Sequence, residues 1–66
     1  MNITLNGKPY DASDVLTIEQ LLNKRNLNKN HIVVEVNEVI VPKEDYCSRR
    51  LENDDFVEIL RFVGGG

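Results

Sequence analysis

The sequence predicts an α+β fold, in which a mixed sheet of four to five strands packs on one helix. Apolar and polar residues alternate near both ends of the 66-residue chain, which is typical of strands with one buried face. Between these ends, one segment carries apolar residues at helical spacing behind a helix-capping sequence. Turn-forming residues separate the segments. We therefore expect a single domain over residues 1–66, with residues 63–66 as a flexible C-terminal tail.

The first two expected strands form a hairpin. Residues 1–5 alternate between apolar and polar side chains, which predicts a strand with one buried face. Asn6 and Gly7 follow, and this pair favours a two-residue hairpin turn because both residues tolerate a positive φ. The chain then returns as a second strand over residues 8–12. Pro9 suits an edge strand, since it has no N–H to donate to a neighbour.

One helix is expected after the hairpin. Thr17 and Gln20 fit a capping box, in which the Thr17 hydroxyl accepts from the Gln20 backbone N–H and the Gln20 side chain bonds back to the Thr17 N–H. The residues expected to face the sheet are Ile18, Leu21 and Leu22, with Arg25 at the next helical position. Asparagine favours turns and left-handed backbone, so the helix should end in the segment that contains Asn26, Asn28 and Asn30.

The second half of the chain predicts three strands and one helical turn. The expected strands cover residues 31–37, 39–41 and 56–63. A turn at Asn37 joins the first two, and Pro42 stops the second. One helical turn over residues 43–46 should anchor Tyr46 in the core. A polar turn over residues 52–55 precedes the last strand.

The β-grasp fold is the compact solution for this order of hairpin, helix, strand, short strand and last strand. The helix crosses the mixed sheet, and a right-handed crossover is expected if the strands that it joins are parallel. The last strand would then lie beside the first, near the middle of the sheet. The tail would leave from a rigid base.

The last strand is expected to have one face in the core and one in solvent. Burying the mid-strand carboxylate of Glu58 without a partner would cost several kcal/mol, so its face should be the wet one. Val57 and Ile59 then point to the helix. Leu60 and Phe62 remain exposed beside the tail, and we interpret them as a partner-binding surface. The alternative is the opposite facing of the strand, with Phe56 and Leu60 in the core.

Composition and charge exclude several classes of partner. The chain has 41% hydrophobic and 29% charged residues, as in ordinary soluble proteins, and a net charge of −3. An acidic surface attracts neither nucleic acid nor an anionic membrane, so we expect neither partner. No apolar run approaches the roughly 20 residues that span a bilayer, and the alternating start is unlike a signal peptide. We expect a cytoplasmic protein that is a monomer when free.

Few side chains offer chemistry. A single histidine, His31, at a strand start favours a surface or capping role over catalysis or metal binding. Cys47 has no patterned base beside it, so we expect a structural or incidental thiol. The pairs Glu44-Asp45 and Asp54-Asp55 are expected to be solvated charges in turns. We therefore expect no catalytic residue and no metal site.

Three glycines, Gly64, Gly65 and Gly66, follow Val63 at the end of the sequence. Glycine loses more conformational freedom on ordering than any other residue, so packing gains nothing from such an ending. An extended chain from Val63 to Gly66 reaches roughly 13 Å, at about 3.3–3.6 Å per residue. This length could place a terminal carboxylate inside a partner's site while the folded body stays outside. The alternative is a frayed terminus.

Taken together, these motifs resemble the ThiS family of sulfur carrier proteins of thiamine biosynthesis, small β-grasp relatives of ubiquitin with a terminal Gly-Gly. The resemblance rests on the strand-turn-strand over residues 36–42 and on Tyr46, where many members have tryptophan. It also rests on the acidic turn before the last strand and on the closing residues 63–66. The resemblance covers the whole chain without insertions.

The resemblance implies a carrier protein and not an enzyme. Gly66 would supply a carboxylate that a ThiF-like E1 enzyme activates as an acyl-adenylate. The ATP and Mg²⁺ for this step would be bound by the E1 enzyme. Sulfur transfer would convert the adenylate to a thiocarboxylate, which a ThiG-like thiazole synthase would use as sulfur donor. Val63, Gly64 and Gly65 would enter the partner active site with Gly66. The chain itself is expected to bind no cofactor.

Three other functions remain open at this point. A MoaD-like small subunit of molybdopterin synthase uses the same tail chemistry, but MoaD proteins tend to be longer. A ubiquitin-like modifier would join its tail to lysines. A β-grasp binding module would have incidental glycines.

Overall fold

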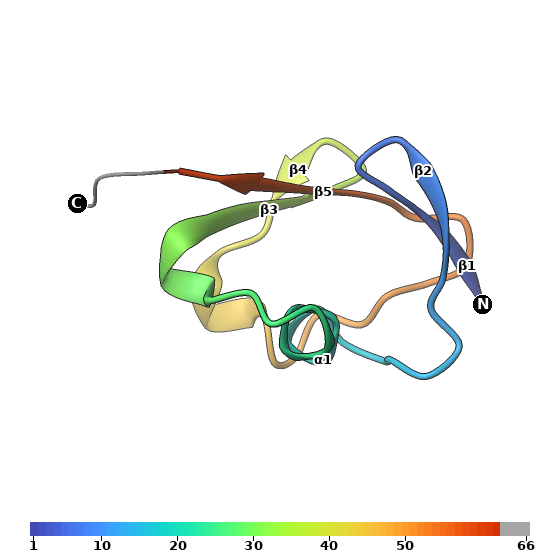
Figure 1. Cartoon of the computed structure of the whole chain (residues 1–66), viewed down its shortest axis with the longest axis horizontal. Helices are drawn as coiled ribbons and strands as arrows, with labels where there is room; N and C mark the ends of the chain where they lie inside the picture. The colour runs from blue at the N-terminus through green and yellow to red at the C-terminus, as the bar shows by residue number, and fades with distance from the viewer. Residues whose placement is uncertain (63–66) are drawn as a thin grey trace.

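The computed structural model describes residues 1–62, which form a five-stranded sheet and one α-helix (Figure 1). The elements in chain order are β1 (Asn2–Leu5), β2 (Lys8–Asp11), α1 (Ile18–Lys24), the 3-10 turn η1 (Lys29–His31), β3 (Ile32–Val36), β4 (Val39–Ile40), the 3-10 turn η2 (Lys43–Asp45) and β5 (Phe56–Arg61). The strand order is β2-β1-β5-β3-β4. The expected α+β class is confirmed.

β5 lies in the middle of the sheet, as expected. It runs parallel to β1 and antiparallel to β3, while β2 and β4 pair antiparallel at the two edges. The edge position of β2 confirms the interpretation of Pro9. Figure 1 shows α1 on one side of the sheet, and within residues 1–62 no element covers the other side.

The hairpin turn has the expected backbone. Asn6 and Gly7 have φ values of 49° and 82°. A Cβ on Gly7 would meet no atom within 4 Å, so a side chain would find room there. Glycine is favoured because of the positive φ. Met1 is 37% exposed and lies outside β1, so the buried face of this strand belongs to Ile3 and Leu5.

The start of α1 confirms one half of the predicted capping box. Thr17 is the N-cap, and its hydroxyl accepts from the Gln20 N–H at 3.2 Å. The other half was wrong: Gln20 Oε1 accepts from the Leu16 N–H at 2.7 Å instead of from Thr17. The extended segment before the helix forms a bridge between Thr17 and Arg50, and this places the Leu16 N–H within reach of Gln20.

The end of α1 differs from the expectation at one residue. The helix ends at Lys24, and Asn26 has a left-handed φ of 56° as predicted for an asparagine there. Arg25, expected on the sheet-facing side, is exposed as the C-cap residue. Its guanidinium lies 5.6 Å from the centroid of the Tyr10 ring.

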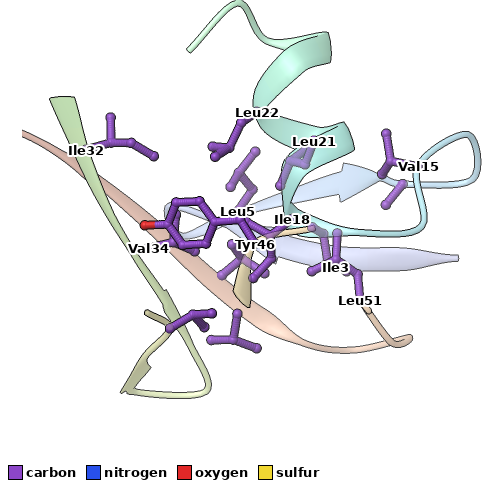
Figure 2. Packing of buried hydrophobic residues seen from close by; sticks show 14 residues of the cluster. Ile3, Leu5, Val15, Ile18, Leu21, Leu22, Ile32, Val34, Tyr46 and Leu51 are labelled. Atoms are coloured by element: carbon purple, nitrogen blue, oxygen red, sulfur yellow. The ribbon is translucent and has the colours of Figure 1, made fainter. Parts of the chain in front are cut away.

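The core lies between α1 and the sheet. Figure 2 shows Ile18, Leu21 and Leu22 pointing from the helix towards the strands, with the Tyr46 ring between them and Val34. The predicted anchor role of Tyr46 is confirmed, because it follows η2 and is only 3% exposed. Burial raises the pKa of its phenol.

Several boundaries differ by a few residues. η1 was not predicted, and β3 therefore begins after His31. β4 stops one residue before the expected end, although the next side chain, Val41, is buried. β5 is assigned to Arg61, but the Phe62 N–H still donates to the His31 carbonyl at 3.1 Å. The expected end of this strand at residue 63 lies outside the described residues. No helix within residues 1–62 is long and apolar enough to cross a bilayer.

Candidate functional site

The facing of β5 agrees with the prediction from Glu58. Val57 is 1% exposed and Ile59 is half-buried, so both point towards the helix. On the other face, Leu60 is 49% exposed and Phe62 is 45% exposed. The exposure of Leu60 and Phe62 was therefore predicted correctly, while their role in binding a partner stays a prediction.

The strand register extends this exposed face beyond β5. Leu60 lies opposite Val33, and Glu58 lies opposite Glu35. Ile40 of β4, which is 63% exposed, lies on the other side of Glu35. These residues, with Phe56 and Phe62, form what we call the outer face: Val33, Glu35, Ile40, Phe56, Glu58, Leu60 and Phe62.

Two carboxylates stand side by side within the apolar outer face. Glu35 and Glu58 are directly opposite on neighbouring strands, a placement that is unfavourable for like charges. Among residues 1–62, no lysine or arginine forms an ion pair with either of them. A partner with apolar side chains and one cation would relieve this repulsion. The pairing of Glu35 with Glu58 depends on the register between two strands that are distant in the sequence.

A hydrogen-bonded clamp fixes the start of β5. Asn37 exchanges backbone and side-chain bonds with Phe56: its N–H donates to the Phe56 carbonyl at 2.7 Å, and its Oδ1 accepts from the Phe56 N–H at 2.9 Å. Its Nδ2 donates to Asp55 Oδ1 at 3.1 Å. A single side chain in the β3–β4 turn thus holds the turn against the first residue of the central strand.

The clamp corrects the interpretation of Asp55 as a solvated charge. Asp55 is 7% exposed, and its carboxylate accepts hydrogen bonds from Asn37 Nδ2 and from the Glu52 N–H at 2.8 Å. These donors compensate for the lost hydration. Asp54, Glu44 and Asp45 are exposed as expected.

The middle of β5 is held from the β1 side, and the residue after its end is held from the β3 side. Asn6 donates its N–H to the Val57 carbonyl at 2.9 Å, and its Oδ1 accepts from the Ile59 N–H at 2.8 Å. On the other side, the His31 carbonyl accepts from Phe62. The contribution of His31 here is thus its backbone, and its side chain is exposed. These bonds hold the described chain in place as far as Phe62.

The tail residues Val63, Gly64, Gly65 and Gly66, predicted to enter a partner's active site, lie outside the described residues. Within residues 1–62, no three His, Cys, Asp or Glu side chains lie close enough to hold a metal ion. Cys47 is an exposed free thiol.

Comparisons with known proteins agree on one family. The model of the ThiS family matches residues 3–66. The sulfur carrier protein ThiS of Bacillus subtilis is 40% identical over 65 residues, which cover 97% of this chain and 98% of that protein. The crystal structure of the thiamine biosynthesis protein ThiS from Geobacter metallireducens superposes with a TM-score of 0.84 at 32% identity, covering 100% of both chains. The expected β-grasp fold is thereby confirmed.

A second kind of relative is much longer than this chain. A protein of Magnetococcus marinus named thiazole synthase is 36% identical over 66 residues, which are 100% of this chain but 20% of that protein. A thiazole synthase of Paramagnetospirillum magneticum matches over the same shares at 35% identity. These thiazole synthases therefore include a region similar to the whole of this chain.

Proposed function

The chain belongs to the ThiS family and is a ThiS-type sulfur carrier of thiamine biosynthesis, and on this premise we propose that Gly66 is the residue that carries the sulfur. In this proposal the protein is a co-substrate of partner enzymes. The folded body presents the tail, and the partners supply the reactive groups.

The chemistry requires activation by a partner. A terminal carboxylate has a pKa of about 3.3–3.7, so at neutral pH it is an anion and a poor electrophile. A ThiF-like enzyme would join it to AMP, with release of pyrophosphate from ATP and with Mg²⁺ balancing the phosphate charge. A hydrosulfide ion from the sulfur source would then attack the carbonyl carbon, AMP would leave with one former carboxylate oxygen, and the thioacid would lose its proton. The product is a thiocarboxylate on Gly66.

The structural observation that best supports this proposal is the anchoring of β5. The strand occupies the centre of the sheet and is clamped at its start by Asn37. Asn6 bonds to its middle, and the His31 carbonyl bonds to Phe62 directly after its end. The chain reaches residue 63 directly after the last of these bonds. A rigid body and a short glycine segment together can deliver a carboxylate to a narrow site.

The outer face supports a role in partner selection. Leu60 and Phe62 are exposed apolar residues next to the tail, and Glu35 and Glu58 add an unpaired negative charge to the same surface. We propose that this face docks on the ThiF-like enzyme while the tail enters its active site.

The second proposed partner is a ThiG-like thiazole synthase. Its support is the pair of thiazole synthases that include a region similar to this whole chain. A carrier and the enzyme that consumes its sulfur gain effective concentration when they share one polypeptide.

Intact-mass analysis tests the proposal. The chain is incubated with a ThiF-like enzyme, ATP, Mg²⁺ and a sulfur source, and the expected product has one oxygen replaced by sulfur. Deletion of Gly66 should abolish the change and leave folding intact. Gly65→Val should do the same, because a branched side chain would clash where the partner closes on the extended backbone.

Other outcomes would identify another function. Unchanged mass of the wild-type chain would favour a binding module, and covalent adducts with proteins would favour a modifier. Co-purification with a molybdopterin synthase instead of a thiazole synthase would favour the MoaD-like role. Sulfur incorporation in either tail variant would contradict the proposed role of the tail.

A further inference from the structure

Three cationic side chains gather where α1 ends beside the sheet. One hollow of about 250 Å³ is lined by Asn6, Arg25, Leu27, Ile59 and Arg61. A neighbouring hollow of about 380 Å³ is lined by Leu5, Asn6, Lys8, Pro9, Tyr10 and Arg25. The two share Asn6 and Arg25, and we call them together the basic groove.

The basic groove contrasts with the charge of the whole chain. The protein has a net charge of −3, yet the described residues that line the groove include Lys8, Arg25 and Arg61 and no Asp or Glu. The ion pair found within residues 1–62 joins Lys24 and Asp14, so none of the three cations of the groove is neutralised there by a carboxylate. The groove is therefore complementary to an acidic ligand.

The backbone of β5 also has an open edge at this place. β1 pairs with β5 only as far as Leu5 opposite Val57, and Asn6 then bonds to Val57 and Ile59 before the chain turns away. Hydrogen bonds along a strand alternate in direction. Since Phe62 donates towards β3, the Arg61 N–H faces the side that β1 has left. A sheet edge of this kind can accept one more strand.

We propose that the basic groove docks an extended acidic segment of a partner protein. The segment continues the line of β1 and accepts the Arg61 N–H through a backbone carbonyl. One of its carboxylates lies between the guanidinium groups of Arg25 and Arg61, whose planar donors suit a carboxylate. Its next inward side chain covers Leu27 and Ile59. This docking concerns the folded body and does not depend on modification of Gly66.

Nuclear magnetic resonance titration of the 15N-labelled full chain tests the proposal. The probe is the blocked peptide acetyl-Thr-Glu-Val-Glu-Thr-amide, and its glutamine counterpart is the charge control. We expect saturable shifts at the amides of Asn6, Ile59 and Arg61 with the acidic peptide, and at least threefold weaker binding of the glutamine peptide. The Arg61 amide should also exchange with solvent more slowly in the complex.

Matched variants separate the groove from general charge. Arg25→Gln and Arg61→Gln should each weaken binding of the acidic peptide about threefold or more, because each removes one charged donor. Arg50→Gln removes an exposed arginine outside the groove and should leave binding unchanged. A peptide with N-methylated central residues should bind less well, since the methyl groups obstruct strand pairing.

Several results would overturn the proposal. Absence of saturable shifts, shifts centred outside the groove, or equal binding of the two peptides would each do so. Equal shifts with inorganic phosphate and no added exchange protection of Arg61 would indicate a simple anion site. Shifts that depend on protein concentration without any peptide would indicate that a second copy of the chain occupies the groove.

Discussion

The two faces of β5 carry similar apolar side chains in different surroundings. Val57 is 1% exposed beneath α1, whereas Leu60, three residues later, is 49% exposed on the outer face. The first contributes to folding, since burial of such a side chain stabilises the native state by about 1.5–3 kcal/mol. The second contributes little to folding and is available for contact. An apolar residue in this strand therefore serves stability or recognition according to its face.

The largest expected effect is on the inner face. Val57→Asp places an unpaired carboxylate in the core. The free-energy cost of this burial should remove most of the roughly 5–15 kcal/mol by which a small domain is stable. We expect an unfolded chain. Circular dichroism during a thermal melt checks this, with wild-type chain as the reference. A cooperative melt near the wild-type temperature would mean that the facing is wrong.

The next largest effect is expected at Asn37, whose hydrogen bonds fix the start of β5. Asn37→Ala leaves the Phe56 N–H and the Asp55 carboxylate each without one partner, which should cost about 1–3 kcal/mol. Asn37 also has a positive φ of 52°, and alanine would be strained there.

Asn37→Gly is the control that separates these two causes. Glycine accepts the positive φ but loses the same hydrogen bonds, so it should recover only the part of the loss that is due to strain. Urea titration measures both variants. Wild-type stability of Asn37→Ala would show that the clamp is dispensable.

The pH dependence of stability tests the burial of Tyr46 in the core. Burial raises the pKa of this phenol above its usual value of 10.0, so the folded state holds the proton more tightly than the unfolded state. The stabilisation is fully present below pH 10.0 and is lost as the pH rises through the folded-state pKa.

Denaturant titrations at rising alkaline pH measure this loss. Tyr46→Phe removes the titrating group and should flatten the pH dependence in this range, whatever its effect on stability at neutral pH. An unchanged alkaline slope in Tyr46→Phe would assign the loss to other groups.

The smallest expected effect on stability is on the outer face. Leu60→Asp should change the free energy of unfolding by less than about 0.5 kcal/mol, because its side chain is 49% exposed and does not belong to the core cluster. Its effect should appear in partner binding, as a KM for activation raised roughly fivefold to thirtyfold.

Leu60→Ala distinguishes lost apolar contact from added charge beside Glu35 and Glu58. Both variants should raise KM, and the aspartate variant should raise it more. An unaltered KM in both, with normal folding, would remove Leu60 from the partner surface.

Local signals in the sequence predicted much of the fold. The positive-φ pair Asn6-Gly7, the Thr17 cap and the alternation around Glu58 each depend on neighbours within a few residues. They gave the hairpin, the helix start and the facing of β5 correctly. The anchoring of Tyr46 was also predicted.

Long-range contacts set the limit of that prediction. Asp55 is buried with a hydrogen bond from Asn37, which lies 18 residues away in the chain. No local sequence pattern predicts that hydrogen bond. The bond from Asn6 to Ile59 spans 53 residues. The pairing of Glu35 with Glu58 and the basic groove likewise depend on register between distant segments. Alternation in the sequence predicts which face of a strand a residue occupies, but the residue opposite it on the next strand depends on the register of the folded sheet.

Fragment mass spectrometry of the activated chain tests the central claim most directly. The claim is that the body presents the tail and that Gly66 alone is chemically changed. After incubation with a ThiF-like enzyme, ATP, Mg²⁺ and a sulfur source, the sulfur should be found in the C-terminal fragment, and Cys47→Ser should incorporate it equally. Sulfur attached to Cys47, or incorporation that survives deletion of Gly66, would contradict the account.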